Sequence, residues 1–158
     1  MWCMKFAGCW LPTKSPEAMR DIHKIILHCT ATKPDQDICA ADVDEWHRAR
    51  GWRGIGYHYL IKLNGSVELG RPLDEIGAHC KGQNMGSVGI AYAGGLNDRG
   101  KPEDTMNEMQ EIAWMQLVRS LRMLFGPMSV HGHNEFSAKA CPSFDVQQKY
   151  GWMNQNQK

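Results

Sequence analysis

The stretch Ile22-His-Lys-Ile-Ile-Leu-His-Cys29 is rich in β-branched and aliphatic side chains, a composition that predicts a buried β-strand. A polar loop follows, and residues 40–50 then carry apolar side chains at helical spacing, including Val43 and Trp46. Gly51, directly after this segment, is a typical helix stop. This part of the sequence therefore predicts a buried strand that leads into an amphipathic helix.

Residues 56–63 and 66–70 predict two further strands, joined at Asn64-Gly65. Asn-Gly between apolar runs is the strongest short hairpin signal, because both residues tolerate the positive φ that a tight turn needs. The two strands of a hairpin pair antiparallel. The sheet that contains them is therefore expected to be mixed rather than purely parallel.

Two more strands are predicted at residues 87–93 (SVGIAYA) and 128–131, and residues 144–151 predict a final short helix. Strands that alternate with helices within one domain are typical of a layered α/β fold. The fold class expected is α/β, in a single domain whose central mixed β-sheet of about five strands is flanked by helices.

A long helix is predicted at residues 106–125, between the last two strands. Thr105 and Glu108 have the spacing of a capping box at its start. Apolar residues at helical spacing predict the side of the helix that faces the core. They are Met109, Ile112, Ala113, Leu117, Leu121 and Leu124.

Length and charge exclude several classes of protein. A chain of 158 residues is long enough for one domain with a substantial core. Its formal net charge is only +1, and it has no strongly basic stretch, so no nucleic-acid partner is expected. It has no run of about 18 apolar residues, so no membrane insertion is expected.

The first residues, MWCMKFAGCWLPTK, are partly apolar, but Lys5 and Gly8 interrupt any hydrophobic core of a signal peptide. No signal peptide is predicted, and the protein is expected to be made in the cytoplasm. Without a secretory signal, the cysteines are expected to be reduced thiols. They are Cys3, Cys9, Cys29, Cys39, Cys80 and Cys141.

Three of the seven histidines stand out because they end or follow predicted strands, where ligands commonly bind. His28 ends the first strand, and His131 and His133 lie at and just beyond the strand at 128–131. Cys141 follows eight residues after His133. Two imidazoles and a thiolate are good zinc ligands, and three protein ligands leave a fourth position for water. Spacing alone leaves His131 and His133 as rivals for one ligand position.

The stretch HNEFSAKACPSFD at residues 133–145 resembles the metal-binding signature of amidase-type phage lysozymes. These endolysins belong to the N-acetylmuramoyl-L-alanine amidase family, which is related to the peptidoglycan recognition proteins. The resemblance covers about residues 22–150 and implies their α/β fold. Four more blocks agree in order: LHCTATKP at 27–34, WHRARGWRGIGYHYLIK at 46–62, NGSVELGR at 64–71 and GAHCKGQNMGSVGI at 77–90.

The resemblance implies roles for the residues that match. His28, His133 and Cys141 fall on the family's three ligands of one zinc ion. This match selects His133 over His131, which remains a candidate to line the site. Tyr57 matches the tyrosine that the family places beside the zinc-bound water.

Four further residues receive roles in the same way or remain open. Lys139, two residues before the cysteine ligand, matches the family's second catalytic side chain. His79 and Asn84 lie in the block that borders the substrate groove in relatives, so both are expected to contact substrate. Arg71 could contact either substrate or solvent.

Three aromatic residues of the block at 46–62 have a structural interpretation. His58 is expected to point to the sheet face opposite Tyr57 and to serve the fold. Trp46 and Trp52 flank the end of the predicted helix, and both are expected to pack in the core.

The resemblance implies a zinc-dependent hydrolase that cleaves the amide bond between N-acetylmuramic acid and L-alanine of peptidoglycan. The partner expected is peptidoglycan, the enzyme is expected to be a monomer, and it would reach the cell wall after release from the host cytoplasm. Residues 1–21 are expected to form an N-terminal extension, and residues 22–158 the zinc amidase catalytic domain.

Three alternatives stay open. The chain could be a peptidoglycan-binding receptor without hydrolysis, although relatives that only bind commonly lack the cysteine ligand. Cys141 could be the nucleophile of a cysteine peptidase with His133 as its base, which would leave His28 without a task. Some phage amidases also inhibit a phage RNA polymerase through N-terminal sequence, but residues 1–21 differ from what this side-function requires.

Overall fold

A computed structural model describes residues 19–155 of the chain. Most of the predicted extension at 1–21, together with Cys3 and Cys9, lies outside the described residues. Within the described part, no helix is both long and apolar enough to cross a membrane.

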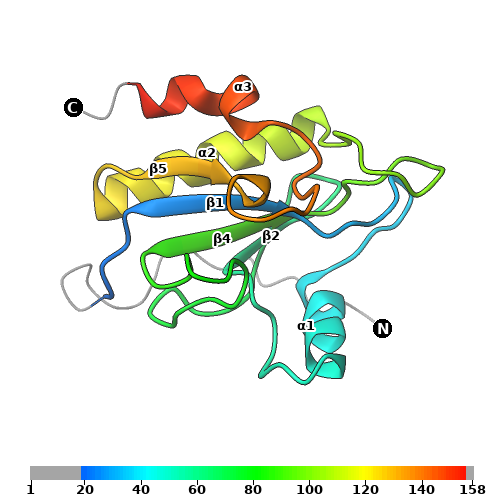
Figure 1. The fold of residues 1–158 in the computed structure, drawn as a ribbon, viewed down its shortest axis with the longest axis horizontal. Helices are drawn as coiled ribbons and strands as arrows, with labels where there is room; N and C mark the ends of the chain where they lie inside the picture. The colour runs from blue at the N-terminus through cyan, green and yellow to red at the C-terminus, as the bar shows by residue number, and fades with distance from the viewer. Residues whose placement is uncertain (1–18, 156–158) are drawn as a thin grey trace.

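A five-stranded mixed sheet forms the centre of the fold, in the order β3-β2-β4-β1-β5 (Figure 1). β1 lies between β4 and β5 and pairs parallel to both, while β2 pairs parallel to β4. The hairpin predicted at Asn64-Gly65 is confirmed, because it joins β2 to the antiparallel edge strand β3. The strands are β1 Lys24–Cys29, β2 Tyr59–Ile61, β3 Val67–Leu69, β4 Ser87–Tyr92 and β5 Ser129–Gly132.

Helices cover both faces of this sheet, so the predicted α/β class is confirmed. α2 (Glu108–Phe125) and α3 (Val146–Tyr150) lie on one face, and α1 (Ala40–Ala49) lies on the other (Figure 1). Two short 3-10 helices, η2 (His133–Glu135) and η3 (Gly151–Asn154), follow β5 and α3.

The two faces of β1 pack against different parts of the protein. Ile25 and Leu27 point into the large core beneath α2, where each fully buried aliphatic side chain stabilises the fold by roughly 1.5–3 kcal/mol. Ile26 and His28 alternate with them and are equally buried on the opposite face. The central strand is therefore apolar almost throughout, and His28 is a polar exception near its carboxyl end.

The start of α2 and part of its core-facing side differ from the prediction, whereas Ala113, Leu117 and Leu121 are buried as predicted. Asn107, rather than Thr105, caps the helix: its Oδ1 accepts the Gln110 N–H at 2.9 Å, and Gln110 Oε1 accepts the Asn107 N–H at 3.1 Å. Thr105 instead accepts the Gly95 N–H at 2.7 Å. The predicted core positions Met109 and Ile112 are 55% and 40% exposed. The buried side of the helix consists of Gln110, Ala113, Trp114, Leu117, Val118 and Leu121.

The prediction of core positions was also wrong for two tryptophans. Trp46 is 36% exposed and Trp52 is 41% exposed. The Trp52 ring packs against the His47 ring with a centroid distance of 4.6 Å and is otherwise partly open to solvent. Both residues lie at the end of a short helix on the thinner layer of the fold, where few elements are available to bury an indole.

The cysteines of the described part are not all reduced. Cys29, Cys80 and Cys141 are free thiols, as predicted. Cys39 is disulfide-bonded, so the expectation of a reduced thiol is wrong there.

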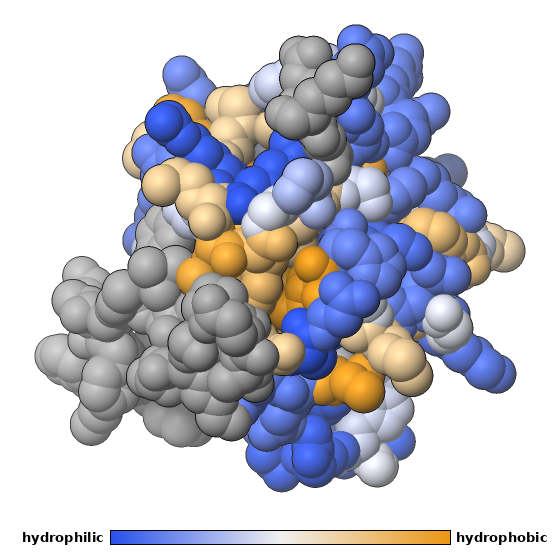
Figure 2. Space-filling view, turned by 90° about the vertical axis from the view of Figure 1, so that its left-hand side faces the viewer, coloured by the Kyte–Doolittle hydropathy of each residue, from blue (hydrophilic) through white to orange (hydrophobic). Residues whose placement is uncertain are grey.

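Figure 2 shows the end of the molecule that lies at the left of Figure 1, where apolar side chains form patches surrounded by hydrophilic ones.

Candidate metal centre and active site

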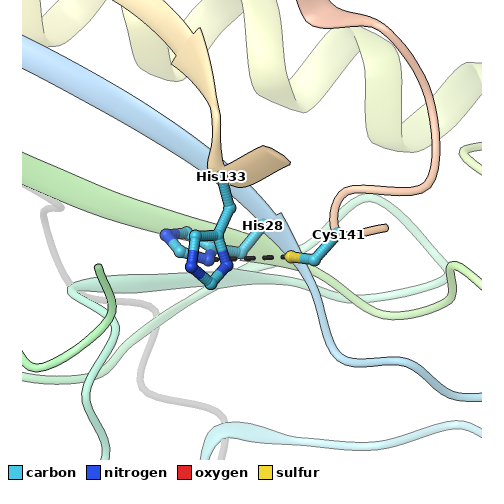
Figure 3. A group of neighbouring side chains, drawn as sticks. All are labelled: His28, His133 and Cys141. Atoms are coloured by element: carbon cyan, nitrogen blue, oxygen red, sulfur yellow. Dashed lines mark hydrogen bonds between the residues drawn. The ribbon is translucent and has the colours of Figure 1, made fainter. Parts of the chain in front are cut away.

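The topology of the sheet brings the three predicted metal ligands together. β1 and β5 are parallel neighbours, with Leu27 opposite Gly132, so their carboxyl ends meet at one edge. His28 follows Leu27 on β1, His133 follows Gly132 at the start of η2, and Cys141 reaches the same place from the next loop. The nitrogen and sulfur ligand atoms of the three side chains all lie within 4.8 Å of one another (Figure 3).

Contacts within this group fix the orientation of its side chains. The His28 and His133 rings lie 4.6 Å apart between centroids. Cys141 Sγ lies 3.7 Å from His28 Nδ1, and the Cys29 N–H donates to the same sulfur at 3.2 Å. Hydrogen bonding with the Cys29 thiol and burial raise the pKa of the Cys141 thiol, and the backbone N–H of Cys29 opposes this shift by favouring the thiolate, the form that binds metal.

The loop that carries Cys141 is held in place by its next two residues. The Tyr92 hydroxyl donates to the Pro142 carbonyl at 2.7 Å. Ser143 has a left-handed backbone with φ of 79°, and its hydroxyl donates to the Gly95 carbonyl at 2.7 Å. Such a conformation costs of order 1–3 kcal/mol in a residue other than glycine, and it persists only where its surroundings hold it.

Burial keeps both imidazoles neutral. It lowers the pKa of His28 well below its ordinary value, and the neighbouring His79, His133 and Lys139 add to the effect. Burial and the charge of Lys139 likewise lower the pKa of His133. A neutral imidazole has a free lone pair, so the two histidines are in the form that binds a metal ion.

Of the two predicted catalytic side chains, Tyr57 lies beside His28, and Lys139 acts on His28 and His133 through its charge. The Tyr57 ring lies 5.0 Å from the His28 ring between centroids, and burial raises the pKa of its phenol above the ordinary value. Lys139 is exposed, yet its charge contributes to the lowered pKa values of both ligand histidines. The site therefore combines two neutral imidazoles, a sulfur, a protonated phenol and a cation.

His79 and Asn84 occupy positions that the sequence did not indicate. His79 is only 8% exposed, and its Nδ1 lies 2.9 Å from His28 Nε2. Asn84 Oδ1 accepts the backbone N–H groups of His79 and Cys80, each at 2.9 Å. The expected contact of these two residues with substrate stays a prediction, whereas the contact between His79 and His28 is a feature that sequence reasoning missed.

His131 is engaged away from the ligand group. Its Nδ1 lies 2.8 Å from Glu135 Oε2, and its Nε2 lies 3.0 Å from Ser129 Oγ. Both ring nitrogens thus have partners on the edge strand β5 and on η2. The group of possible metal ligands found in the described residues contains His133 and not His131.

Arg71 serves the fold and also reaches a cavity. Its guanidinium donates to the carbonyls of Ile55 and Ile76 at 3.0 and 2.9 Å. It also lines a cavity of about 340 Å³. The other charged side chains around this cavity are Asp44, Arg48, Arg53 and Glu75.

The sulfur of Cys141 has a different imidazole neighbour from the one that a cysteine peptidase would need. In that alternative, His133 is the base. Among the contacts in the described residues, the imidazole atom within hydrogen-bond range of the sulfur is His28 Nδ1, at 3.7 Å. The sulfur therefore contacts the third candidate ligand, His28, rather than the base that the peptidase alternative requires.

Comparison with known proteins decides the family. The sequence profile of the N-acetylmuramoyl-L-alanine amidase family matches residues 18–144. The chain belongs to this family. Its relatives include the endolysin of Enterobacteria phage K11, which is 36% identical over 128 residues, covering 81% of this chain and 85% of the relative.

Solved structures of the amidase family and its relatives have the same fold. The N-acetylmuramoyl-L-alanine amidase LysC from Clostridium intestinale superposes with a TM-score of 0.71 at 27% identity, covering 84% of this chain and 87% of that chain. The bumblebee peptidoglycan recognition protein SA superposes with a TM-score of 0.71 at 24% identity, over 86% of this chain and 83% of that chain. The second likeness concerns the fold alone, and the predicted amidase-like architecture is confirmed.

Proposed function

We propose that this protein is a zinc-dependent hydrolase that cleaves the amide bond between N-acetylmuramic acid and L-alanine of peptidoglycan. One observation carries the proposal: His28, His133 and Cys141 converge from three segments with their ligand atoms within 4.8 Å. Membership of the amidase family supports the substrate and the bond.

The chemistry of the three side chains fits zinc. Zinc binds imidazole nitrogen and thiolate sulfur in the same site, and three protein ligands are typical of catalytic rather than structural zinc. A zinc ion held by His28, His133 and Cys141 would supply Lewis acidity, which polarises a carbonyl and activates water.

Tyr57 is suited to donate a hydrogen bond during the reaction. Because burial raises the pKa of its phenol, the hydroxyl keeps its proton at neutral pH. Attack on an amide carbonyl moves negative charge onto the carbonyl oxygen. The phenol of Tyr57 would orient the reacting water or stabilise this developing charge.

Lys139 would stabilise the same charge from the exposed side of the site. Its ammonium group is accessible to substrate, and its electrostatic effect already reaches His28 and His133. Loss of one donor to such an oxyanion typically slows the reaction by about 10²–10³-fold. Tyr57 would thus supply a protonated hydrogen-bond donor, and Lys139 would supply a positive charge.

The division of the chain follows from the same proposal. Residues 22–158 would form the catalytic domain, and residues 1–21 an N-terminal extension. The enzyme would work as a monomer, with no nucleic-acid partner, and would reach the wall after release from the host cytoplasm. His79 and Asn84 keep their proposed place at the border of the substrate groove.

Metal analysis combined with cell-wall hydrolysis tests the proposal. The wild type should contain about one zinc ion per chain, clear purified walls and release new amino groups of L-alanine. Cys141→Ser should lose both zinc and clearing. Cys80→Ser is the matched control, because Cys80 is also a free thiol but lies outside the ligand group.

The outcomes separate the alternatives. Clearing that survives in Cys141→Ser would refute the assigned site. Clearing that survives removal of zinc by a chelator but stops after alkylation of thiols would indicate a cysteine peptidase. Binding to walls without release of amino groups, in the zinc-loaded wild type, would indicate a receptor.

A further inference from the structure

His79 lies behind the metal ligand His28, on the side away from Cys141. His28 Nδ1 faces the sulfur of Cys141, and His28 Nε2 lies 2.9 Å from His79 Nδ1. The two rings meet edge to face at an interplanar angle of 86°. A histidine can bind a metal through Nδ1 only if its proton is on Nε2, so the partner of Nε2 matters.

The direction of the hydrogen bonds can be worked out from the far end of this contact. The Ser87 hydroxyl lies 2.7 Å from the Gln83 carbonyl and 3.3 Å from His79 Nε2. A carbonyl oxygen can only accept, and a hydroxyl has one proton, so Ser87 donates to Gln83. Ser87 must then accept from His79, which places the proton of His79 on Nε2.

The same reasoning continues to the metal ligand. With its proton on Nε2, neutral His79 has only a lone pair on Nδ1. That lone pair faces His28 Nε2 at 2.9 Å, so His28 must donate there and carry its own proton on Nε2. The lone pair of His28 is then on Nδ1, which faces Cys141 and lies near His133.

From this geometry we infer that His79, backed by Ser87, is a positioning residue that holds His28 in the tautomer able to bind zinc through Nδ1. The inference rests on the proposed zinc site. It assigns to His79 a role different from contact with substrate, since His79 acts through His28 and is itself buried.

The surroundings of His79 are shaped for this ring. A Cβ atom added at Gly89 would lie 2.5 Å from His79 Cγ and Cδ2, and one added at Gly77 would also lie 2.5 Å from Cδ2. Two glycines thus leave room for an imidazole in a buried position. Asn84 fixes the backbone beside it by accepting the N–H of His79.

The position of Ser87 is equally defined. It begins β4, is fully buried, and lies opposite Lys24 of β1, four residues before His28. The chain Gln83, Ser87, His79 and His28 therefore links a backbone carbonyl to the metal ligand, with Ser87 on β4 and His28 on the neighbouring strand β1. Residues that hydrogen-bond a metal ligand from behind typically change metal affinity by about 10–100-fold when they are replaced.

Nuclear magnetic resonance of the metal-free wild type at neutral pH tests the tautomer directly. Long-range ¹H–¹⁵N spectra distinguish a protonated Nδ1 from a protonated Nε2 in each histidine. We expect His28 and His79 both to carry the proton on Nε2. A proton on His28 Nδ1 would overturn the inference, and this readout depends neither on zinc nor on activity toward cell walls.

Zinc affinity, measured by competition with a chromogenic chelator, tests the consequence. His79→Phe fills the site without a hydrogen-bond acceptor and should weaken zinc binding by about 10–100-fold. His79→Asn places an amide oxygen near the position of Nδ1 and should restore affinity to within about 3-fold of the wild type. Ser87→Ala should weaken zinc binding less than His79→Phe.

The thermal transition of each metal-free variant separates positioning from folding. The inference is overturned if His79→Phe folds like the wild type and binds zinc with the same affinity. It is also overturned if His79→Asn and His79→Phe lose affinity equally at matched stability. Wild-type protein that binds zinc with the expected tautomer but leaves walls intact would instead refute the proposed function alone.

Discussion

Acid should destabilise this protein through His58, a buried histidine outside the ligand group. The Gly89 N–H donates to His58 Nδ1 at 3.0 Å, so the proton of the neutral ring is on Nε2, 3.1 Å from the Glu75 carbonyl. The Arg20 guanidinium lies 3.0 Å from the same Nε2. A second proton on the ring would face a backbone N–H and bring a positive charge beside arginine.

The size of the effect follows from the pKa of His58. Burial lowers this pKa from 6.5 to about 4 in the folded protein. Above pH 6.5 the imidazole is neutral in both states; between about pH 6.5 and 4 it takes up a proton only when the chain unfolds. The stabilising contribution is therefore present above pH 6.5 and is lost as the pH falls toward 4. At about 1.4 kcal/mol per pH unit, the loss amounts to roughly 3 kcal/mol.

Urea denaturation of the metal-free wild type and of His58→Asn, at about pH 7 and about pH 4.5, measures this term. Asparagine keeps an acceptor near the position of Nδ1 for the Gly89 N–H but cannot take up a proton. The free energy of unfolding of the wild type should fall by about 2–3 kcal/mol more than that of the variant. The histidines that do not contact His58 are present in both proteins, so their contributions cancel in the comparison. Equal losses in the two proteins would refute the assignment to His58.

Three further substitutions test the site and the core. Tyr57→Phe should slow wall hydrolysis by about 10²–10³-fold while zinc content stays at the wild-type level, and a loss of zinc would contradict its role as a donor to the reacting atoms. Leu117→Ala should lower the free energy of unfolding by about 2–5 kcal/mol, because the Leu117 side chain of α2 is buried in the core. A loss below about 1 kcal/mol in urea denaturation would contradict that packing. Gln110→Leu should cost about 1–3 kcal/mol in the same assay, because the Gln110 amide donates to the Ala93 carbonyl at 2.8 Å; unchanged stability would show that this bond contributes nothing.

The parts of the fold that the sequence predicted correctly have local causes. The strand at β1 follows from a run of buried aliphatic residues, and the hairpin follows from the backbone preferences of Asn64 and Gly65. The exact start of α2 was missed because Thr105 and Asn107 are both able to cap a helix. The choice between them depends on Gly95, ten residues before Thr105, whose N–H engages the threonine hydroxyl.

The core-facing side of α2 could not be read from hydrophobicity alone. Gln110 is fully buried because the carbonyls of Ile61 and Ala93 accept its amide protons, at 3.4 and 2.8 Å. The buried side of α2 therefore contains Gln110 and not the neighbouring Met109. A buried polar residue with long-range partners thus shifted the face of the helix, and only the packed sheet reveals those partners.

The group of side chains that could hold a metal ion was predictable because the chemistry of metal binding is restricted. Zinc accepts few side chains, so His28, His133 and Cys141 carry a signal that a family signature preserves. A residue that only supports a ligand is less restricted, because serine, asparagine, a carboxylate or a backbone carbonyl can each accept the same proton. His79 is 51 positions from His28 in the chain, and no spacing rule joins them.

His79 and Asn84 show where residues that support a metal ligand can be sought in related sequences. Both belong to the block at 77–90, which resemblance alone assigns to the substrate groove. In the fold, Asn84 accepts a backbone N–H of His79, and His79 contacts His28, so this block lies behind the candidate metal site. The glycines at 77 and 89 belong to the same arrangement, because a side chain at either position would collide with the imidazole. Replacement of His79 by a larger residue should therefore disturb metal binding before it disturbs contact with peptidoglycan.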